Sequence, residues 1–424
     1  MTRVLELSKT VLLNDVALKL AAFVIAAALV RLFRGPLLNL ARNLVKRLPD
    51  TVEALLRRGA DQLYPSWRSR AGLSRRDTTL EWRLKAVRTS WRPGFFILGG
   101  VYLDLMVQPV TLKRLENYEY SNLDRVRYDC GGSACYVGHY LYQNFRHKSY
   151  LYSRLGEQTA LSSELRTKLD DEEWIRRAHY QRDAHMQSGV SLHLLQADSS
   201  YRTTFTHKGA LDCLDWGPLL KKLVKKTSRG GVLHVSGYFR TGLHKELCHS
   251  LANLSPNLLV CVDHGRFLPE DHRSSADALL EAFSQRLIDL YICTFPELCR
   301  LMVLADVESD GDSTVEETLQ KFAASGKLPR VTVIRGHAAM DETSAHIILD
   351  NELLPTVSVT PGLPPSRDVP GRNNAFNAAV MFYLTKGSAD VPLPVAISSV
   401  VRQALESWIS TARATGLMSS WKGP

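Results

Sequence analysis

Residues 95–107 read FFILGGVYLDLMV, and this stretch decides how the rest of the chain is interpreted. It is apolar apart from the pair Gly99-Gly100 and a single acid, Asp104. An apolar run of this kind, rich in β-branched and aromatic residues, predicts a buried strand over 95–107.

Further apolar runs of strand length follow, and stretches of helical character separate them. This alternation is typical of a mainly parallel sheet covered by helices, which is an α/β fold. The pattern predicts strands over 149–155, 190–197, 231–237, 258–263, 290–294 and 331–336, and helices over 163–186, 243–251, 274–287, 314–324, 374–383 and 394–411.

Short motifs at the ends of these runs occur in a recognisable order. Their order and spacing, over about 310 residues, resemble the ribokinase-like (phosphofructokinase-B-type) family of carbohydrate and nucleoside kinases. The resemblance implies a ribokinase-like fold with a small β lid. The segments that carry it are 95–105, 129–141 (DCGGSACYVGHYL), 154–157 (RLGE), 188–210, 262–266 (VDHGR) and 369–381 (VPGRNNAFNAAVM).

The resemblance also implies a substrate site, and here the chain departs from the family. Asp104 corresponds to the acid that faces the substrate hydroxyls, and Gly131 and Gly132 correspond to the G-G of G-G-x-x-x-N. Tyr136 stands where the family has the asparagine, and its ring is too bulky for the same sugar contact. These four residues are therefore interpreted as a relic substrate site.

The family's G-A-G-D segment opens a helix whose backbone N–H groups bind the transferred phosphate, and its aspartate is the base for the substrate hydroxyl. The corresponding residues here are Gly371, Arg372, Asn373 and Asn374, a relic anion hole. The Asn374 amide cannot accept a proton at neutral pH, and loss of a base costs on the order of 10²- to 10⁴-fold in rate. The resemblance therefore predicts a degenerate family member without a catalytic residue.

Two further motifs of the family have changed. Residues 294–297 (TFPE) replace N-x-x-E, which the family associates with metal and phosphate, and of its acids only Glu297 remains, one position out of register. Ile334 stands where the family's T-x-G strand end has its threonine. No cofactor is expected, and ATP with Mg²⁺ would bind only if nucleotide binding survived.

The N-terminal arm carries the basic charge of the chain. Residues 1–92 hold 18 Lys or Arg and 7 Asp or Glu, whereas the remainder holds 35 and 36, which makes the body nearly neutral. A nucleic-acid groove on the body is therefore unsupported. We expect three parts: an apolar anchor helix and a basic amphipathic helix within 1–60, an Arg/Trp-rich linker over 61–94, and the ribokinase-like domain over 95–424.

Residues 16–33 (VALKLAAFVIAAALVRLF) are just long enough to span a thin bilayer, and the basic amphipathic stretch within 37–48 suits an anionic membrane surface. A membrane anchor competes with two other interpretations of 16–33. One is a cleaved secretory or mitochondrial presequence, and the other is a helix packed inside the protein or on a partner.

Several classes of site are not indicated. The seven cysteines form no C-x-x-C pair, and the C-x4-C spacing of Cys130 and Cys135 has no second half, so no metal site is expected and the thiols are expected to be reduced. No Walker P-loop, G-x-S-x-G or dinucleotide-binding G-x-G-x-x-G occurs, which excludes the matching enzyme classes.

Three functional hypotheses follow. The first is an inactive pseudokinase, anchored to lipid through residues 16–48, that serves as an accessory subunit of a mitochondrial inner-membrane assembly such as a respiratory-chain complex, with the other subunits as its partners. The second is an active ATP-dependent sugar or nucleoside kinase. The third is a mitochondrial ribosome- or RNA-associated subunit, which the apolar run Leu20–Val30 disfavours because RNA-binding arms seldom contain one.

Overall fold

The chain divides into two compact units, Met1–Gly72 and Leu73–Pro424. The computed structural model describes residues of the second unit, namely 75, 78–90, 92–110, 125–196, 202–217, 219, 222–224, 230–265, 273–307, 313–336, 344–359, 372–388 and 391–417. The anchor and the amphipathic helix expected within 1–60 lie outside the described residues.

The body is built on a large sheet with the strand order β13-β12-β11-β10-β9-β8-β1-β4-β5, and β14 pairs with β12. From β11 to β5 all neighbouring strands are parallel, while β12 is antiparallel to β11. The strands are β1 (Gly94–Gly99), β4 (Ser149–Gly156), β5 (Ile175–Asp183), β8 (Gly231–Ser236), β9 (Leu258–Asp263), β10 (Leu290–Thr294), β11 (Val331–Arg335), β12 (Ser344–Leu349), β13 (Glu352–Leu353) and β14 (Val357–Ser358).

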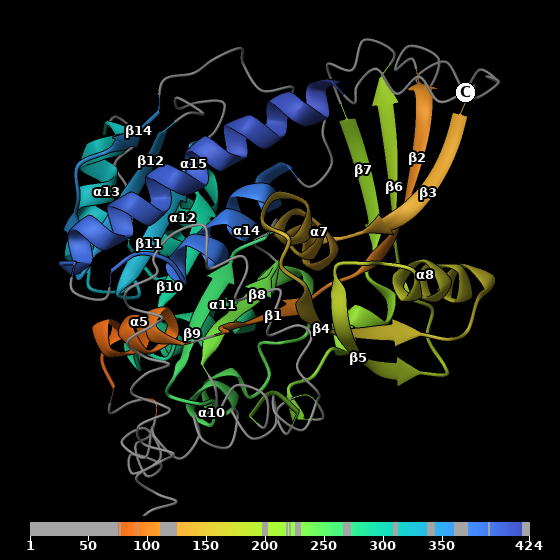
Figure 1. Cartoon of the computed structure of the whole chain (residues 1–424), viewed down its shortest axis with the longest axis horizontal. Helices are drawn as coiled ribbons and strands as arrows, with labels where there is room; N and C mark the ends of the chain where they lie inside the picture. Colours follow the sequence, from red (N-terminus) through yellow and green to blue (C-terminus); the bar gives the residue numbers. More distant parts are fainter. Residues whose placement is uncertain are drawn as a thin grey trace, which may run out of the picture. The chain divides into compact units, whose positions relative to one another are not determined.

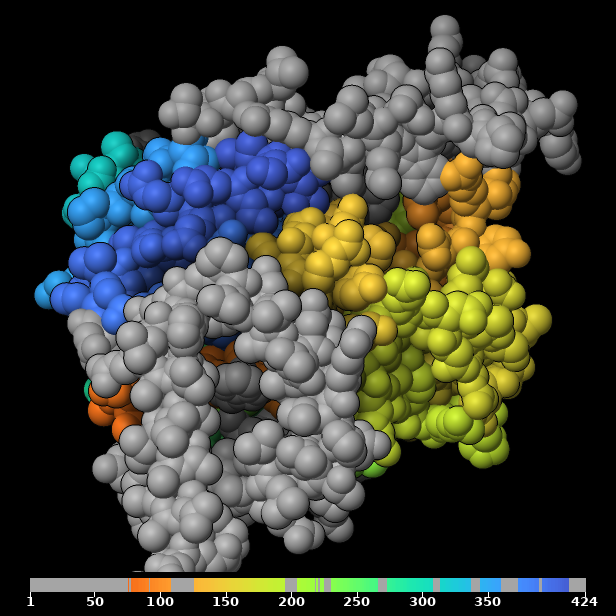
Figure 2. Space-filling view, in the orientation of Figure 1, coloured from red at the N-terminus to blue at the C-terminus, as the bar shows by residue number. Residues whose placement is uncertain are grey.

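Helices cover both faces of this sheet, which explains why its central strands are continuous apolar runs. One core lies under α5 (Leu80–Thr89), α7 (Ser133–Phe145), α8 (Ala160–Asp170), α14 (Arg372–Leu384) and α15 (Leu393–Leu417). The other lies under α10 (Leu247–Ala252), α11 (Arg273–Ser284), α12 (Phe295–Leu304) and α13 (Val315–Ala324). In the space-filling view α15, in dark blue, covers one part of the first face, and the segments around α7 and α8, gold to yellow-green, cover another (Figure 2).

A second, four-stranded sheet with the order β3-β2-β6-β7 stands beside the large one (Figure 1). It consists of β2 (Tyr102–Val110), β3 (Arg125–Gly131), β6 (Gly189–Gln196) and β7 (Arg202–His207). We call it the small sheet. The single strand predicted over 95–107 is thus two strands that break at Gly100 and Val101, and the chain passes there from the large sheet to the small one.

The segment that precedes the body is fixed to the amino ends of β9 and β10. The buried Arg75 side chain bonds the carbonyl oxygens of Leu258 and Leu287 and the carboxylate of Asp289. Arg83 of α5 donates from Nε to Asp289 Oδ1 at 2.8 Å. Burial lowers the pKa of Arg75 to about 10, so its guanidinium stays charged at neutral pH. The C-terminal part of the predicted linker therefore packs on the body.

The helix predicted over 163–186 is wrong in its second half. The helix α8 ends at Asp170, and residues 175–183 form β5, which pairs in parallel with β4 at the edge of the large sheet. The pairing explains the difference, since the ladder with β4 satisfies the backbone of β5 while its charged side chains Arg176, Arg177 and Arg182 stay exposed.

A helix that crosses a bilayer must be both long and apolar. None of the described helices combines the length and the apolar composition that crossing a bilayer requires. The stretch 16–33 is not among them, because it lies outside the described residues.

Candidate functional site

Asp104 lies on β2 of the small sheet, and its carboxylate is almost completely buried. The hydroxyl of Tyr136, in the first turns of α7, donates to Asp104 Oδ2 at 2.6 Å. His193 Nε2 of β6 lies 3.2 Å from the same oxygen, although it lacks the alignment of a hydrogen bond. Three side chains from separate elements therefore converge. The Asp104 carboxylate, which the family resemblance expects to face a sugar hydroxyl, is in contact with Tyr136 and His193 instead.

The surroundings hold this arrangement in place. His193 Nδ1 contacts Thr204 Oγ1 of β7 at 3.0 Å, which fixes the ring on the small sheet. A Cβ atom on Gly131 would lie 1.9 Å from the Asp104 carboxyl group, so only glycine fits there. Gly132 has φ +89°, a conformation that favours glycine and that lets α7 begin directly after β3. The structure thus brings together Asp104, Gly131, Gly132 and Tyr136.

The second predicted site is the start of α14, at the carboxyl ends of the parallel strands. Asn373 is exposed and Asn374 is half-buried in the first turn, while Gly371 lies outside the described residues. The Arg335 side chain, at the end of β11, donates from Nη1 to the carbonyl oxygen of Asn373 at 3.0 Å. A guanidinium group therefore lies beside a helix terminus that carries an amide in place of a carboxylate.

Arg335 is itself held from two sides. Its Nη2 lies 3.6 Å from Asp263 Oδ1, at the end of β9, and its guanidinium carbon lies 5.9 Å from the centre of the Phe376 ring. The side chain is only 8% exposed, so its charge is paired inside the protein. Asp263 is consequently committed to Arg335.

His234, on β8, is a buried histidine that interacts electrostatically with Asp263 and Arg335. Burial lowers its pKa to about 4, while Asp263 acts to raise it and Arg335 to lower it further. The ring is fully buried, and it is neutral at pH 7. A group that is so weakly basic and so inaccessible is a poor substitute for a catalytic carboxylate.

Glu297, the remaining acid of the altered N-x-x-E motif, has a structural partner. Thr294 ends β10 and caps α12, and its backbone N–H donates to Glu297 Oε2 at 2.8 Å in a capping box. The two residues are three positions apart, as in N-x-x-E, so the acid is in register and the expected shift of one position is incorrect. In this structure Glu297 initiates a helix.

Residues that could hold a metal ion lie elsewhere, at the end of β3. Asp129, Cys130 and Glu172 place one ligand atom each within 4.8 Å of one another. Burial raises the pKa of Glu172, and Asp129 raises it further. The C-x4-C spacing was noted in the sequence, but Glu172 is far away along the chain, and only the turn after α8 brings it close.

The sequence motifs did not indicate which side chains pack against Asp104 and the start of α14. His193 and Thr204 join Asp104 through the strand register of the small sheet, which pairs Asp104 with Ser191 and His193 with Thr204. Arg335 directly follows Ile334, at the T-x-G position. A charged residue at the end of an apolar strand was the sequence signal that could have indicated a partner for the start of α14.

No family model and no curated protein sequence matches the chain. Solved structures do match. Phosphofructokinase-2 from Escherichia coli in complex with substrates and products superposes with a TM-score of 0.55 at 16% identity, over 76% of this chain and 93% of that one. Apo adenosine kinase from Trypanosoma brucei brucei gives 0.56 at 16% identity, over 77% and 99%.

The ribokinase of Arabidopsis thaliana, complexed with ribose and ATP, gives a TM-score of 0.52 at 14% identity, over 76% of this chain and 93% of that one. Each likeness covers nearly all of the solved kinase. The fold found in this way is the one that the order of motifs in the sequence led us to expect. The chain therefore has the fold of the ribokinase-like carbohydrate and nucleoside kinases, in a strongly diverged form.

Proposed function

We propose that this protein no longer transfers phosphoryl groups and serves as a membrane-anchored accessory subunit of a larger mitochondrial inner-membrane assembly, with a respiratory-chain complex as the first one to test. The observation that carries the first part is the 2.6 Å hydrogen bond from the Tyr136 hydroxyl to the buried Asp104. A substrate hydroxyl would have to displace this internal partner.

The start of α14 supports the same conclusion. Attack on a phosphoryl group needs a base that receives the proton of the hydroxyl. Asn374 supplies an amide at this place, and the guanidinium of Arg335 is paired with Asp263 and with the Asn373 carbonyl. The two altered regions act on the same reaction, one on substrate binding and the other on proton transfer.

Turnover of ATP with a panel of sugars and nucleosides tests the loss of activity. We expect the unmodified chain to show no turnover above background. The variant Asn373→Gly/Asn374→Asp restores the base but keeps the Tyr136 side chain against Asp104. Adding Tyr136→Asn removes that side chain. We expect turnover to increase most in the triple variant, because base and binding site are then restored together.

The matched control is Tyr136→Phe in the Asn373→Gly/Asn374→Asp background, which removes the hydroxyl and keeps the ring. It should give less turnover than Tyr136→Asn, since the ring still fills the site. Turnover by the unmodified chain that Asp104→Asn abolishes would contradict the proposal and establish an active kinase.

The membrane part of the proposal is supported by the sequence of the arm. Residues 1–92 carry the excess of 18 basic over 7 acidic residues, and Leu20–Val30 contains no charge. An Arg-rich, acid-poor N-terminus is typical of mitochondrial proteins, and lipid can take up the apolar run.

Extraction of the native protein from membranes tests this part. Release by detergent but not by high salt, with co-sedimentation in a large complex, is expected. The variant Ala27→Arg places a charge at the centre of the apolar run, at a cost of about 2.5–3.5 kcal/mol for insertion, and should release the protein. Lys46→Gln/Arg47→Gln, in the basic stretch, should weaken attachment only slightly. Release by salt alone, as for an RNA-bound protein, would overturn the membrane assignment.

A further inference from the structure

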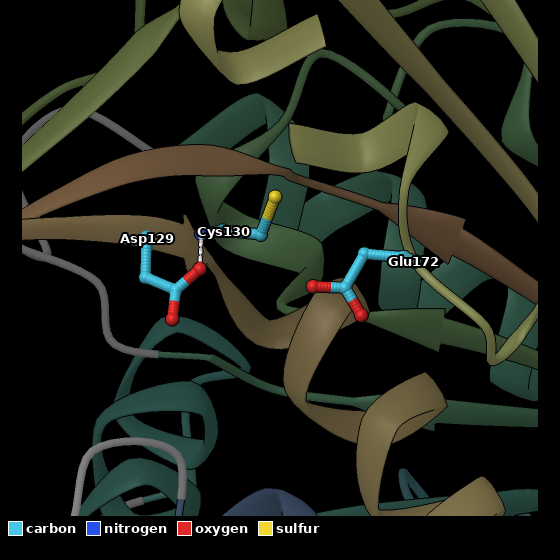
Figure 3. Close-up of side chains that lie close together, drawn as sticks. All are labelled: Asp129, Cys130 and Glu172. Carbon is cyan, nitrogen blue, oxygen red and sulfur yellow. Dashed lines mark hydrogen bonds between the residues drawn. The ribbon is translucent and has the colours of Figure 1, made fainter. Parts of the chain in front are cut away.

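A group of soft and acidic ligands lies where the small sheet meets the turn after α8. Asp129 and Cys130 are neighbours near the end of β3, and Glu172 follows α8. Their ligand atoms lie within 4.8 Å of one another. In Figure 3 the Glu172 carboxylate is directed toward the side on which Asp129 and Cys130 lie, while the Cys130 sulfur points away from the line between the two carboxylates.

Each of these side chains is oriented by a neighbour. Asp129 Oδ1 accepts a hydrogen bond from the Cys130 backbone N–H at 2.8 Å. Burial raises the pKa of Glu172, while the neighbouring side chain of the buried Trp174 acts to lower it. A Cβ atom on Gly138 would lie 2.2 Å from the Trp174 ring, so the indole is wedged against α7. Hydrogen-bonded outer residues of this kind are a regular feature of metal sites.

A second thiol completes the group. Cys135, in the first turn of α7, is buried, and its pKa is raised by burial first and then by the neighbouring Cys130. The group therefore contains two carboxylates and two thiols from three elements, and it is more specific than an exposed acidic cluster.

The negative charge of this group is only weakly compensated by the neighbouring lysine. Lys168 Nζ lies 4.0 Å from Asp129 Oδ1 and 5.0 Å from the centre of the Tyr128 ring. An exposed pair at this separation contributes little. A bound divalent cation would compensate the two carboxylates and the thiolate far more strongly.

We propose that Asp129, Cys130 and Glu172 bind one divalent cation of the zinc class. A tetrahedral ion with Zn–S of about 2.3 Å and Zn–O of about 2.1 Å needs ligand atoms under about 4 Å apart, so the three side chains must close by about 1 Å. The Asp129 side chain is 60% exposed, which permits this movement and leaves a fourth position for water. Calcium and magnesium fit poorly, because they prefer all-oxygen sites.

The ion would join two parts of the fold. Cys130 belongs to the small sheet, whereas Glu172 lies in the turn that leads from α8 into β5 of the large sheet. Gly131 and Gly132, which pack against Asp104 and start α7, follow directly. Metal binding is therefore expected to fix the small sheet relative to the large one, and binding releases the proton of Cys130.

Titration of the reduced full-length chain with Co²⁺ under argon tests the proposal. The expected result is one ion per chain with a thiolate-to-cobalt charge-transfer band and tetrahedral d–d bands, both removed by Zn²⁺. Histidine sites give no thiolate band, so the thirteen histidines do not confuse the readout. Cys130→Ser should abolish the band, and Glu172→Gln should weaken Co²⁺ binding by about 10-fold or more.

Cys213→Ser is the matched control, because Cys213 is an exposed thiol outside the group, and it should leave the titration unchanged. Folding of each variant is checked by circular dichroism. A fully reduced, folded chain that gives no charge-transfer band would overturn the proposal. The same holds if the band persists in Cys130→Ser.

Discussion

At the amino ends of β9 and β10, the buried carboxylate of Asp289 faces two guanidinium groups, whereas on the small sheet the buried carboxylate of Asp104 faces a phenol and an imidazole. The first arrangement pairs full charges and attaches the preceding segment to the body. The second places a phenol and an imidazole next to an acid. Both satisfy a buried acid internally and join residues of separate elements, but only the first pairs the acid with two guanidinium groups.

The Asp289 pair gives the largest expected effect. Asp289→Asn would leave Arg75 and Arg83 buried without a carboxylate. Removing one partner of a buried ion pair costs about 3–5 kcal/mol, which would show as a lower free energy of unfolding in urea. Asp350→Asn, which removes an exposed partner of Arg330, should cost less than about 1 kcal/mol. Equal losses of stability for Asp289→Asn and Asp350→Asn would contradict the interpretation of Asp289 as a buried ion-pair partner.

The buried His234, which interacts with Asp263 and Arg335, should make the free energy of unfolding depend on pH. Its folded-state pKa is lowered to about 4, so below pH 6.5 the unfolded chain binds a proton that the folded chain excludes. Stability should therefore fall as pH decreases from about 6.5 to 4, by up to about 3 kcal/mol at 1.36 kcal/mol per pKa unit.

His234→Asn should remove this part of the pH dependence, whatever its effect at pH 7. The measurement is the free energy of unfolding of both proteins across the pH range. A constant difference between them would show that the imidazole titrates normally in the folded state.

Tyr136→Phe tests the neutral partner of Asp104. Loss of a hydrogen bond to a buried carboxylate should cost about 1.5–3 kcal/mol. Tyr142→Phe on the same helix is the matched control, because its hydroxyl bonds the exposed Glu173 at 3.0 Å and should cost much less. In an Asp104→Asn background the effect of Tyr136→Phe should shrink, and full additivity would argue against the contact.

The smallest expected effect is on the surface beside the Asp289 pair. The side-chain hydrogen bond from Arg330 lowers the pKa of Glu81 on α5. Its contribution is present above about pH 4.5 and is lost as pH falls through the lowered folded-state pKa. Glu81→Gln should therefore reduce stability by less than about 1 kcal/mol at pH 7, and the difference from the unmodified chain should disappear in acid.

The comparison also shows what a sequence can predict. Six strands beyond the first, from 149–155 to 331–336, were located within a few residues. Five of them belong to the large sheet, where buried parallel strands are continuous apolar runs, and the sixth, 190–197, is β6 of the small sheet. The edge strand β5 was mistaken for a helix, since its arginines and tyrosine form no such run. The break at Gly100 was not predicted because the same apolar run continues from one sheet into another.

For the candidate sites too, features that are local in the sequence could be predicted, whereas contacts between distant segments could not. Glycines and acids in ordered motifs led to Asp104, Gly131 and Asn374, since motif positions are local in sequence. The partners of these residues were not predicted, because His193 and Arg335 meet them through strand register and helix packing. Glu172 joins Cys130 for the same reason, through a turn that no local pattern specifies.

The capping box of Glu297 has a consequence for how catalytic motifs are recognised in sequences. An acid in this register has two separate reasons to be present: it can serve a reaction, or it can satisfy the first backbone N–H group of a helix. A survey that counts this position as a surviving catalytic motif would score the chain as partly active. Substitution of Glu297 would change how α12 begins, so by itself it would not test whether this acid takes part in a reaction.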